Sequence, residues 1–208
     1  MFSYVYKETT TCHQCQIFDG KRKLVPLPLN PISVEAPFQQ WGLDFIGEIN
    51  PNYSGQHRWI LTTTDYFTKW IEAIPTRRAT NAVIMDFLEE NILARFGCLK
   101  RIMTVIVPAF KYKKMISFCH KYHISINHSI AYHPRGNGLV EYSNKILVRI
   151  IKKLLEDNKR ALHTKLKYAL WRERISTKRT IGMSPFQLVY GAEVIFPTSF
   201  GVLVMKLL

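Results

Sequence analysis

The sequence has few acidic residues for its size. It contains 15 Asp and Glu residues against 29 Lys and Arg residues, which leaves a formal net charge of +14. An excess of this size favours a phosphate-bearing partner such as a nucleic acid. The alternative is a basic protein that has no such partner.

Long apolar runs are also lacking. No stretch approaches the ~18–20 apolar residues that a membrane-spanning helix needs, so we expect no membrane partner. The first residues show no basic patch followed by an apolar stretch, so a secretory signal peptide is not indicated. With 47% hydrophobic residues, the chain is nonetheless apolar enough to bury a core.

Cysteine is scarce, with 4 residues in 208 at irregular positions. A secreted disulfide framework is therefore disfavoured, and we expect an intracellular protein, in the nucleus or the cytoplasm. Cys12 and Cys15 have the two-residue gap of half a zinc site. A closed structural zinc site needs four ligands, so these residues are either a half-site or two free thiols, and bound Zn²⁺ is not expected in this fragment.

From residue 38 onward, the periodicity predicts strands that alternate with helices. The strands, rich in aromatic and β-branched residues, are expected over 43–49, 59–63, 69–74, 101–107 and 124–127. The helices, each with one apolar face, are expected over 80–97, 111–122, 139–156, 161–172 and 184–191. This order predicts an α/β fold with a mixed sheet.

The composition divides the chain into four segments. Residues 24–37 contain four prolines, which fix their own φ and bias the preceding residue away from helix, so this stretch is expected to be an extended linker. The other segments are residues 1–23, a folded core over 38–160 and a helical C-terminal extension over 161–208.

Two short motifs carry acids in distinctive surroundings. The stretch 41–47 (WGLDFIG) places Asp44 in an apolar strand, and the stretch 133–145 (HPRGNGLVEYSNK) places Glu141 just after a Gly-rich turn. A buried carboxylate is rare unless it is paired or bound to metal, which favours a functional Asp44. An acid near a helix N-terminus is commonly a solvated residue that the helix dipole favours, so Glu141 alone carries less weight.

Together the two motifs resemble the catalytic core of retroelement integrases, most closely that of gypsy-type LTR retrotransposons. The likeness covers residues 12–208, because the stretch 180–191 (TIGMSPFQLVYG) also resembles the segment after the gypsy-type core. The resemblance implies a ribonuclease H-like fold, with a five-stranded mixed sheet and flanking helices. It also implies a homo-oligomer that integrates element DNA into host DNA by 3′-end processing and strand transfer.

In that family the reaction depends on three acids that hold Mg²⁺ or Mn²⁺, ions that prefer oxygen ligands. Asp44 matches the first acid and Glu141 the third, so both are candidate catalytic and metal-binding residues. The family's spacing, counted back from Glu141, puts the second Asp at position 105, where this chain has Val105. Valine cannot ligate a metal ion, so we expect catalysis to be absent or strongly impaired. Asp65 lies in a turn, where Asp commonly bonds its own backbone, and is not expected to replace the acid.

The loop over 129–138 and the long helix after it match positions that touch DNA in the family. The candidate DNA-binding residues are Tyr132, His133, Arg135, Asn137, Lys145, Arg149, Lys152 and Lys153. Because Glu141, Lys145 and Arg149 are four residues apart, we expect them to share one helix face. The alternatives are a salt bridge between Glu141 and Lys145, and an ordinary solvated face for the basic run.

The resemblance also bears on residues 1–23 and on rival functions. In the family a zinc module supplies two His residues before its Cys pair, and none precedes Cys12 here, so residues 1–23 are expected to be a truncated remnant. One rival function is a non-catalytic nucleic-acid-binding or assembly protein with an integrase-like fold. The other is a decayed element product with no function.

Overall fold

The computed structural model describes residues 2–13, 34–47, 57–97, 99–105, 113–129, 138–155 and 161–195. The chain divides into residues 1–32 and residues 33–208, and each unit is described by itself. In the first unit, helix α1 spans Phe2–Thr11 and Cys12 is an exposed free thiol. The composition does not predict this helix. Cys15 and residues 24–33 of the expected linker lie outside the described residues, and the boundaries at 23, 37 and 160 stay predictions.

The second unit is built on a five-stranded mixed sheet in the order β3-β2-β1-β4-β5. Its strands are β1 (Gln40–Ile46), β2 (Trp59–Asp65), β3 (Ile71–Thr76), β4 (Arg101–Val105) and β5 (Ser125–Ser129). The first three strands pair antiparallel, whereas β4 runs parallel to both β1 and β5. Parallel neighbours need a crossover, which the intervening helices provide.

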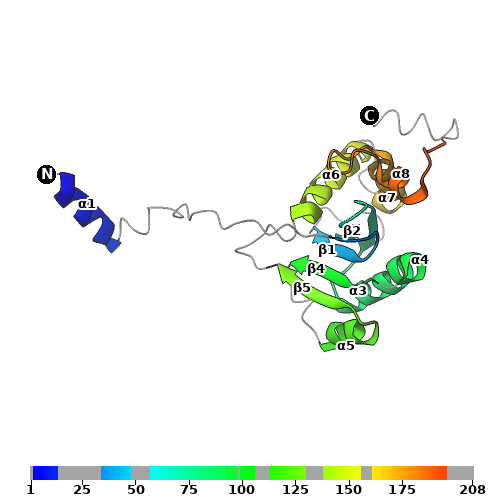
Figure 1. Ribbon diagram of the computed structural model, residues 1–208, viewed down its shortest axis with the longest axis horizontal. Helices are drawn as coiled ribbons and strands as arrows, with labels where there is room; N and C mark the ends of the chain where they lie inside the picture. The colour runs from blue at the N-terminus through cyan, green and yellow to red at the C-terminus, as the bar shows by residue number, and fades with distance from the viewer. Residues whose placement is uncertain are drawn as a thin grey trace. The chain divides into compact units, whose positions relative to one another are not determined.

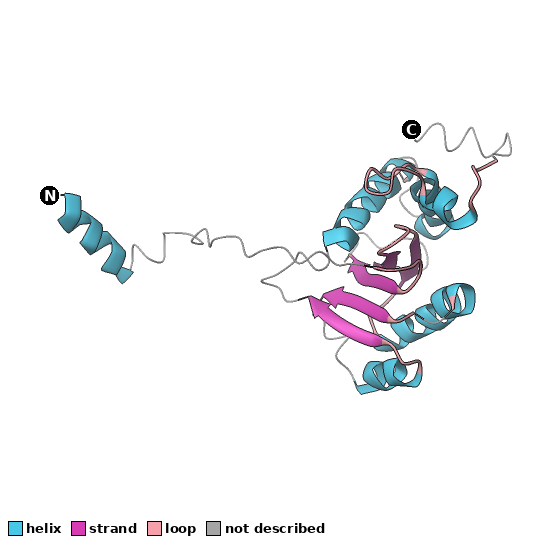
Figure 2. Ribbon diagram, viewed as in Figure 1, coloured by secondary structure: helices cyan, strands magenta, loops and turns pink. Residues whose placement is uncertain are grey.

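Helices cover both faces of the sheet (Figures 1 and 2). They are α3 (Asn81–Phe87), the π-helical stretch η2 (Leu88–Leu93), α4 (Ala94–Phe96), α5 (Lys113–Lys121), α6 (Gly138–Leu154), α7 (Leu162–Ile175) and α8 (Pro185–Tyr190). Figure 1 shows α3, α4 and α5 on one side of the sheet, and α6 and α7 on the other. None of these helices combines the length and the apolar character needed to span a bilayer, which holds for the described ranges only.

Side-chain alternation along the strands produces two apolar layers. Leu61 of β2 packs in the layer under α3 and α5, with Phe87 and Met115. The preceding residue, Ile60, packs in the other layer, with Leu147 of α6 and Leu166 of α7. Both faces of the sheet are therefore buried, and the helical C-terminal extension supplies part of the second layer.

The predicted strands and helices of the second unit are present, with shifted ends. The strand expected from residue 69 begins at Ile71, because Lys69 adopts a positive φ of 62° in the turn that follows β2. The expected helix start at residue 80 is confirmed, since Val83 N–H donates to Thr80 Oγ1 at 3.5 Å. The expected stop at Gly97 is also confirmed, with a φ of 81°. The π-helical stretch η2 inside this helix is not predicted by the periodicity.

A buried charge cluster fixes α7 against β3. Glu72 is 4% exposed, and its Oε2 lies 2.7 Å from Arg174 Nη2. The Oε1 atom of Glu72 lies 2.9 Å from Arg95 Nη1 and accepts a hydrogen bond from Trp70 Nε1 at 2.9 Å. Arg174 also donates through Nε and Nη2 to the carbonyl oxygen of Ile71, at 3.0 and 2.9 Å. The cluster therefore joins β3, α4 and α7.

We predict that Glu72→Ala lowers the free energy of unfolding by roughly 3–5 kcal/mol, because it leaves the Arg174 guanidinium buried without its carboxylate. Chemical denaturation measures this loss. The control is Glu89→Ala, which removes the exposed pair with Lys121 at 3.8 Å and the hydrogen bond from the Tyr122 hydroxyl at 2.6 Å, and which should cost much less. Equal losses in the two variants would show that the cluster does not hold the C-terminal helices.

Candidate active site

Asp44 lies in β1 and is partly buried. Its Oδ1 accepts a hydrogen bond from Phe45 N–H at 2.8 Å, and its Oδ2 accepts one from Asn144 Nδ2 at 2.9 Å. Burial raises the pKa of Asp44 above its ordinary value, and the charge of Glu141 raises it further, against the lowering effect of the two hydrogen bonds. This carboxylate is therefore held in a position where its negative charge is disfavoured.

Glu141 lies in the first turn of α6 and is partly exposed. Asn144, one turn later on the same helix, is hydrogen-bonded to Asp44, and the charge of Glu141 contributes to the raised pKa of Asp44, so the two carboxylates lie within electrostatic reach of each other. The structure thus brings together the two acids that the sequence motifs single out. Two like charges in close reach are typical of sites that bind a cation.

Asn144 ties α6 to the sheet. Its side chain is buried. Its Oδ1 accepts a hydrogen bond from Thr62 Oγ1 at 2.9 Å, and its Nδ2 donates to Asp44. Thr62 Oγ1 also lies 3.3 Å from the carbonyl oxygen of Asp44. Asn144 and Glu141 are three residues apart, so they lie on neighbouring positions of one helix face. The hydrogen bonds of Asn144 therefore set where Glu141 lies.

The sequence motifs do not single out Asn144 as a site residue, although a signal for it exists. A polar amide at the spacing of three from Glu141 falls on a helix face that is otherwise directed toward the sheet. A buried amide requires partners, and an acid in the facing strand is a suitable acceptor. Pairing these two observations would have found Asn144.

Val105 is the last residue of β4, the strand that lies next to β1. The register pairs Leu43 with Thr104, so Asp44 and Val105 occupy the next position along the two neighbouring strands. The backbone thus places position 105 beside Asp44. The residue at that position carries no oxygen that could ligate a metal ion.

The residues of this site do not fit a complete two-ion centre. In the described ranges, no group of three or more His, Cys, Asp and Glu side chains could hold a metal ion. Asp65 does not fill the gap, because it is buried and its carboxylate accepts from Phe38 N–H, Thr68 N–H and Thr68 Oγ1 at 3.1, 2.7 and 2.7 Å. The predicted turn role of Asp65 is confirmed. Asp44 and Glu141 could hold part of a metal's coordination sphere, and Val105 adds no further ligand.

The candidate DNA-binding residues fall into two groups. The loop residues lie outside the described residues; they are Tyr132, His133, Arg135 and Asn137. The α6 residues are exposed; they are Lys145, Arg149, Lys152 and Lys153. Within the described part of the chain, Lys145 makes no ion pair with Glu141. Its ammonium group is available to another anion.

The expectation that Arg149 shares a face with Glu141 stays a prediction. Arg149 lines a hollow together with Tyr142 and Ile146, whereas Glu141 does not line it. An α-helix turns by about 100° per residue, so residues eight apart are rotated by about 80° from each other. Residues four apart are offset by about 40° around the helix, and this offset doubles for residues eight apart.

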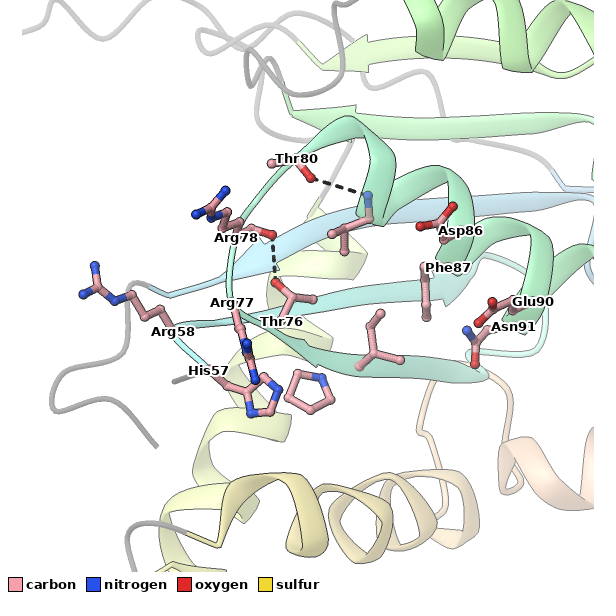
Figure 3. A pocket seen from close by; sticks show the side chains of 13 residues that line it. His57, Arg58, Thr76, Arg77, Arg78, Thr80, Asp86, Phe87, Glu90 and Asn91 are labelled. Carbon is pink, nitrogen blue, oxygen red and sulfur yellow. Dashed lines mark hydrogen bonds between the residues drawn. The ribbon is translucent and has the colours of Figure 1, made fainter. Parts of the chain in front are cut away.

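A hollow of about 1150 Å³ lies between the end of β3 and α3 (Figure 3). Its polar and charged lining residues are His57, Arg58, Thr76, Arg77, Arg78, Thr80, Asp86, Glu90 and Asn91. Figure 3 shows two hydrogen bonds within this lining, from Val83 N–H to Thr80 Oγ1 and from Thr76 Oγ1 to the carbonyl oxygen of Arg78. Neither Asp44 nor Glu141 lines this hollow, so it is separate from the candidate active site.

Comparison with known proteins gives a consistent assignment. Residues 34–134 match the integrase core domain family. The chain is 33% identical over 184 residues to the Gag-Pol polyprotein of avian reticuloendotheliosis virus, which covers 88% of this chain and 16% of that polyprotein. It is 30% identical over 184 residues to the Gag-Pol polyprotein of baboon endogenous virus (strain M7), covering 88% of this chain and 10% of that polyprotein. The chain thus spans less than a fifth of these relatives.

Solved structures show the same fold. The simian T-cell lymphotropic virus intasome in complex with the PP2A regulatory subunit B56 gamma matches with a TM-score of 0.71 and 22% identity, over 95% of this chain and 69% of that chain. The HTLV-2 integrase catalytic core domain in complex with magnesium, in a trimeric form, matches with a TM-score of 0.58 and 22% identity, over 73% of this chain and 95% of that chain. The ribonuclease H-like fold is confirmed, and the chain belongs to the retroviral-type integrases through its integrase core domain.

Proposed function

We propose that this chain is the core part of a gypsy-type retrotransposon integrase that binds DNA and whose 3′-end processing and strand transfer are impaired. The observation that carries this proposal is the placement of three positions. Asp44 and Glu141 lie within electrostatic reach, and the neighbouring strand has Val105 at the register position beside Asp44. The viral relatives support the reaction class, and the valine supports the impairment.

In this reaction class, two divalent ions stabilise the attacking and the leaving oxygens of an in-line displacement. Mg²⁺ or Mn²⁺ is the cofactor that the proposal implies, and the magnesium-bound core of the HTLV-2 enzyme supports it. Because Asp44 and Glu141 are an incomplete ligand set, we assign no catalytic step to the ions in this chain. Zn²⁺ has no part in the proposal.

DNA binding is the part of the proposed function that does not need the missing acid. Lys145 lies one turn from Glu141 on α6, and Lys152 lies further along the helix, both with exposed side chains. Cations placed in this way bind phosphates without reading base sequence, and such binding weakens as salt rises. The simian virus neighbour is an intasome, which supports DNA and further copies of the chain as partners. The location that we propose is the nucleus or the cytoplasm.

The rival function is a non-catalytic DNA-binding or assembly protein with this fold. The observation that favours it is the same Val105, because the fold and the basic helix are kept while the ligand set is incomplete. The two functions differ in one measurable property. An impaired enzyme regains strand transfer when the acid is restored, whereas a protein that has lost the rest of the machinery does not.

We predict that Val105→Asp raises Mg²⁺-dependent strand transfer by at least about 100-fold, because a restored carboxylate completes the ligand set. An oligonucleotide strand-transfer assay on both chains measures the ratio. Asp44→Asn in the Val105→Asp background is the control and should remove the gain. Strand transfer by the unaltered chain that Asp44→Asn abolishes would show that Val105 is no defect.

We also predict that Mg²⁺ stabilises the Val105→Asp chain against thermal unfolding more than it stabilises the unaltered chain. A ligand at about 100 times its Kd adds ~2.7 kcal/mol to the free energy of unfolding. Differential scanning fluorimetry across a Mg²⁺ series measures the shift. Val105→Asn is the matched control, because an Asn side chain has nearly the shape of Asp but no charge. This variant should behave like the unaltered chain. Equal shifts in all three chains would contradict metal binding at position 105.

A further inference from the structure

A second hollow, of about 590 Å³, lies between α6 and the connection from α7 to α8. On one wall, α6 contributes Tyr142, Ile146 and Arg149. The opposite wall comes from the end of α7 and from residues 176–180. Neither Asp44 nor Glu141 belongs to its lining, so the hollow is distinct from the candidate active site.

Positive charge dominates this hollow. Its cationic lining residues are Lys69, Arg149, Arg172, Lys178 and Arg179. Its one acid, Glu173, is 2% exposed and is paired with Lys178. Lys69 donates to the carbonyl oxygen of Tyr66 at 2.6 Å. Lys178 therefore neutralises the acid from within the fold, and Arg172 also interacts with it electrostatically. The guanidinium groups of Arg149, Arg172 and Arg179 are the remaining positive charges of the lining.

Among the described residues, no side-chain hydrogen bond or ion pair engages these guanidinium groups. The Nε atom of Arg172 is buried and has no hydrogen-bond partner among the described residues. Arg149 and Arg179 are exposed, and neither takes part in an ion pair of the described ranges. A buried donor without a partner calls for an explanation, and a bound acceptor is one. Guanidinium groups bind phosphate through paired N–H donors, so an oxyanion fits this lining best.

The lining also has an apolar and aromatic side. Leu139, Ile146 and Ile150 line the hollow beside the arginines. Tyr142 belongs to the same wall and is 62% exposed, which is a high value for an aromatic residue of a folded core. Exposed aromatic rings next to cations are the usual platform for bases of a nucleic-acid strand, which stack on the ring while the cations bind the backbone.

We propose that this hollow binds a nucleic-acid strand, with a backbone phosphate held by Arg149, Arg172 and Arg179 and a base stacked on Tyr142. The inference rests on the proposed DNA-binding function and adds a second contact to it. Arg149 is rotated by about 80° around α6 from Glu141, and neither Asp44 nor Glu141 lines the hollow, so this contact is distinct from the acid pair. A free phosphate offers the same oxyanion chemistry without a base. Comparing inorganic phosphate with an oligonucleotide distinguishes a free anion from a nucleic-acid strand.

The test compares two double variants that each remove two positive charges. Arg149→Gln/Arg179→Gln alters the hollow, and Lys113→Gln/Lys114→Gln alters exposed residues of α5, across the sheet. Fluorescence anisotropy with a single-stranded oligonucleotide, over a range of salt, gives log K against log salt. Each lost phosphate contact reduces the slope by about 0.7, so the hollow variant should lose up to ~1.4 and the control should keep its slope. Arg149→Lys/Arg179→Lys, which keeps the charge, should retain most of the slope.

Tyr142→Ala tests the stacking contact separately. It should weaken binding of the strand about tenfold and leave the salt slope unchanged, since it removes no charge. Thermal melts of all variants, followed by circular dichroism, show that they remain folded. A weaker affinity together with an unchanged slope is a result that a general loss of charge does not produce.

Three results would overturn the inference. If the unaltered chain binds the strand and both double variants keep its slope, the hollow is no strand site, and the proposed function stands. If inorganic phosphate stabilises the unaltered chain but not the hollow variant, while strand binding is the same in both, the hollow binds a free anion. If the unaltered chain binds no oligonucleotide at any salt concentration, the proposed DNA-binding function fails and the inference fails with it.

Discussion

The carboxamide of Asn144 is the contact on which the geometry of the acid pair depends. It is hydrogen-bonded to Asp44 of β1 and to Thr62 of β2, and both Thr62 and Asn144 are buried. Any shift of α6 along the sheet would leave buried polar atoms without partners, which costs more than the bonds themselves contribute. Glu141, one turn earlier on the helix, is held near Asp44 by this contact although the two carboxylates repel each other.

The second support of α6 comes from the C-terminal helices. Leu147 and Ile150 of α6 share an apolar layer with Leu166 and Ala169 of α7. The Glu72 cluster in turn holds α7 against β3, at the edge of the same sheet. The position of Glu141 is thus set from two sides, by polar contacts at the sheet and by apolar packing against α7. The helices after residue 160 therefore help to position Glu141 in the candidate active site.

Local patterns in the sequence were enough to predict the order of strands and helices, because each element has its own apolar period and its own end signals. Thr80 and Gly97 bound one helix as expected, and Ser184 caps α8 through Gln187 N–H at 3.1 Å. The acid pair followed from the motif resemblance. Contacts between distant residues were harder to predict. The Glu72–Arg174 pair leaves no periodic signal, and the Asn144 bridge is indicated only when its spacing from Glu141 is combined with the acid in the facing strand. The π-helical stretch η2 keeps the apolar face while changing the turn.

A valine at position 105 is compatible with the fold for an electrostatic reason. Burial and the nearby Glu141 already raise the pKa of Asp44, so without a cation this edge of the sheet bears an unfavourable concentration of negative charge. A third carboxylate at position 105 would add to that repulsion, whereas an aliphatic residue in a strand with high β-propensity does not. Valine at this position therefore adds no repulsion at this edge of the sheet. A chain with Val105 can keep the sheet, the Asn144 bridge and the exposed lysines of α6, so the proposed DNA binding does not require a third carboxylate.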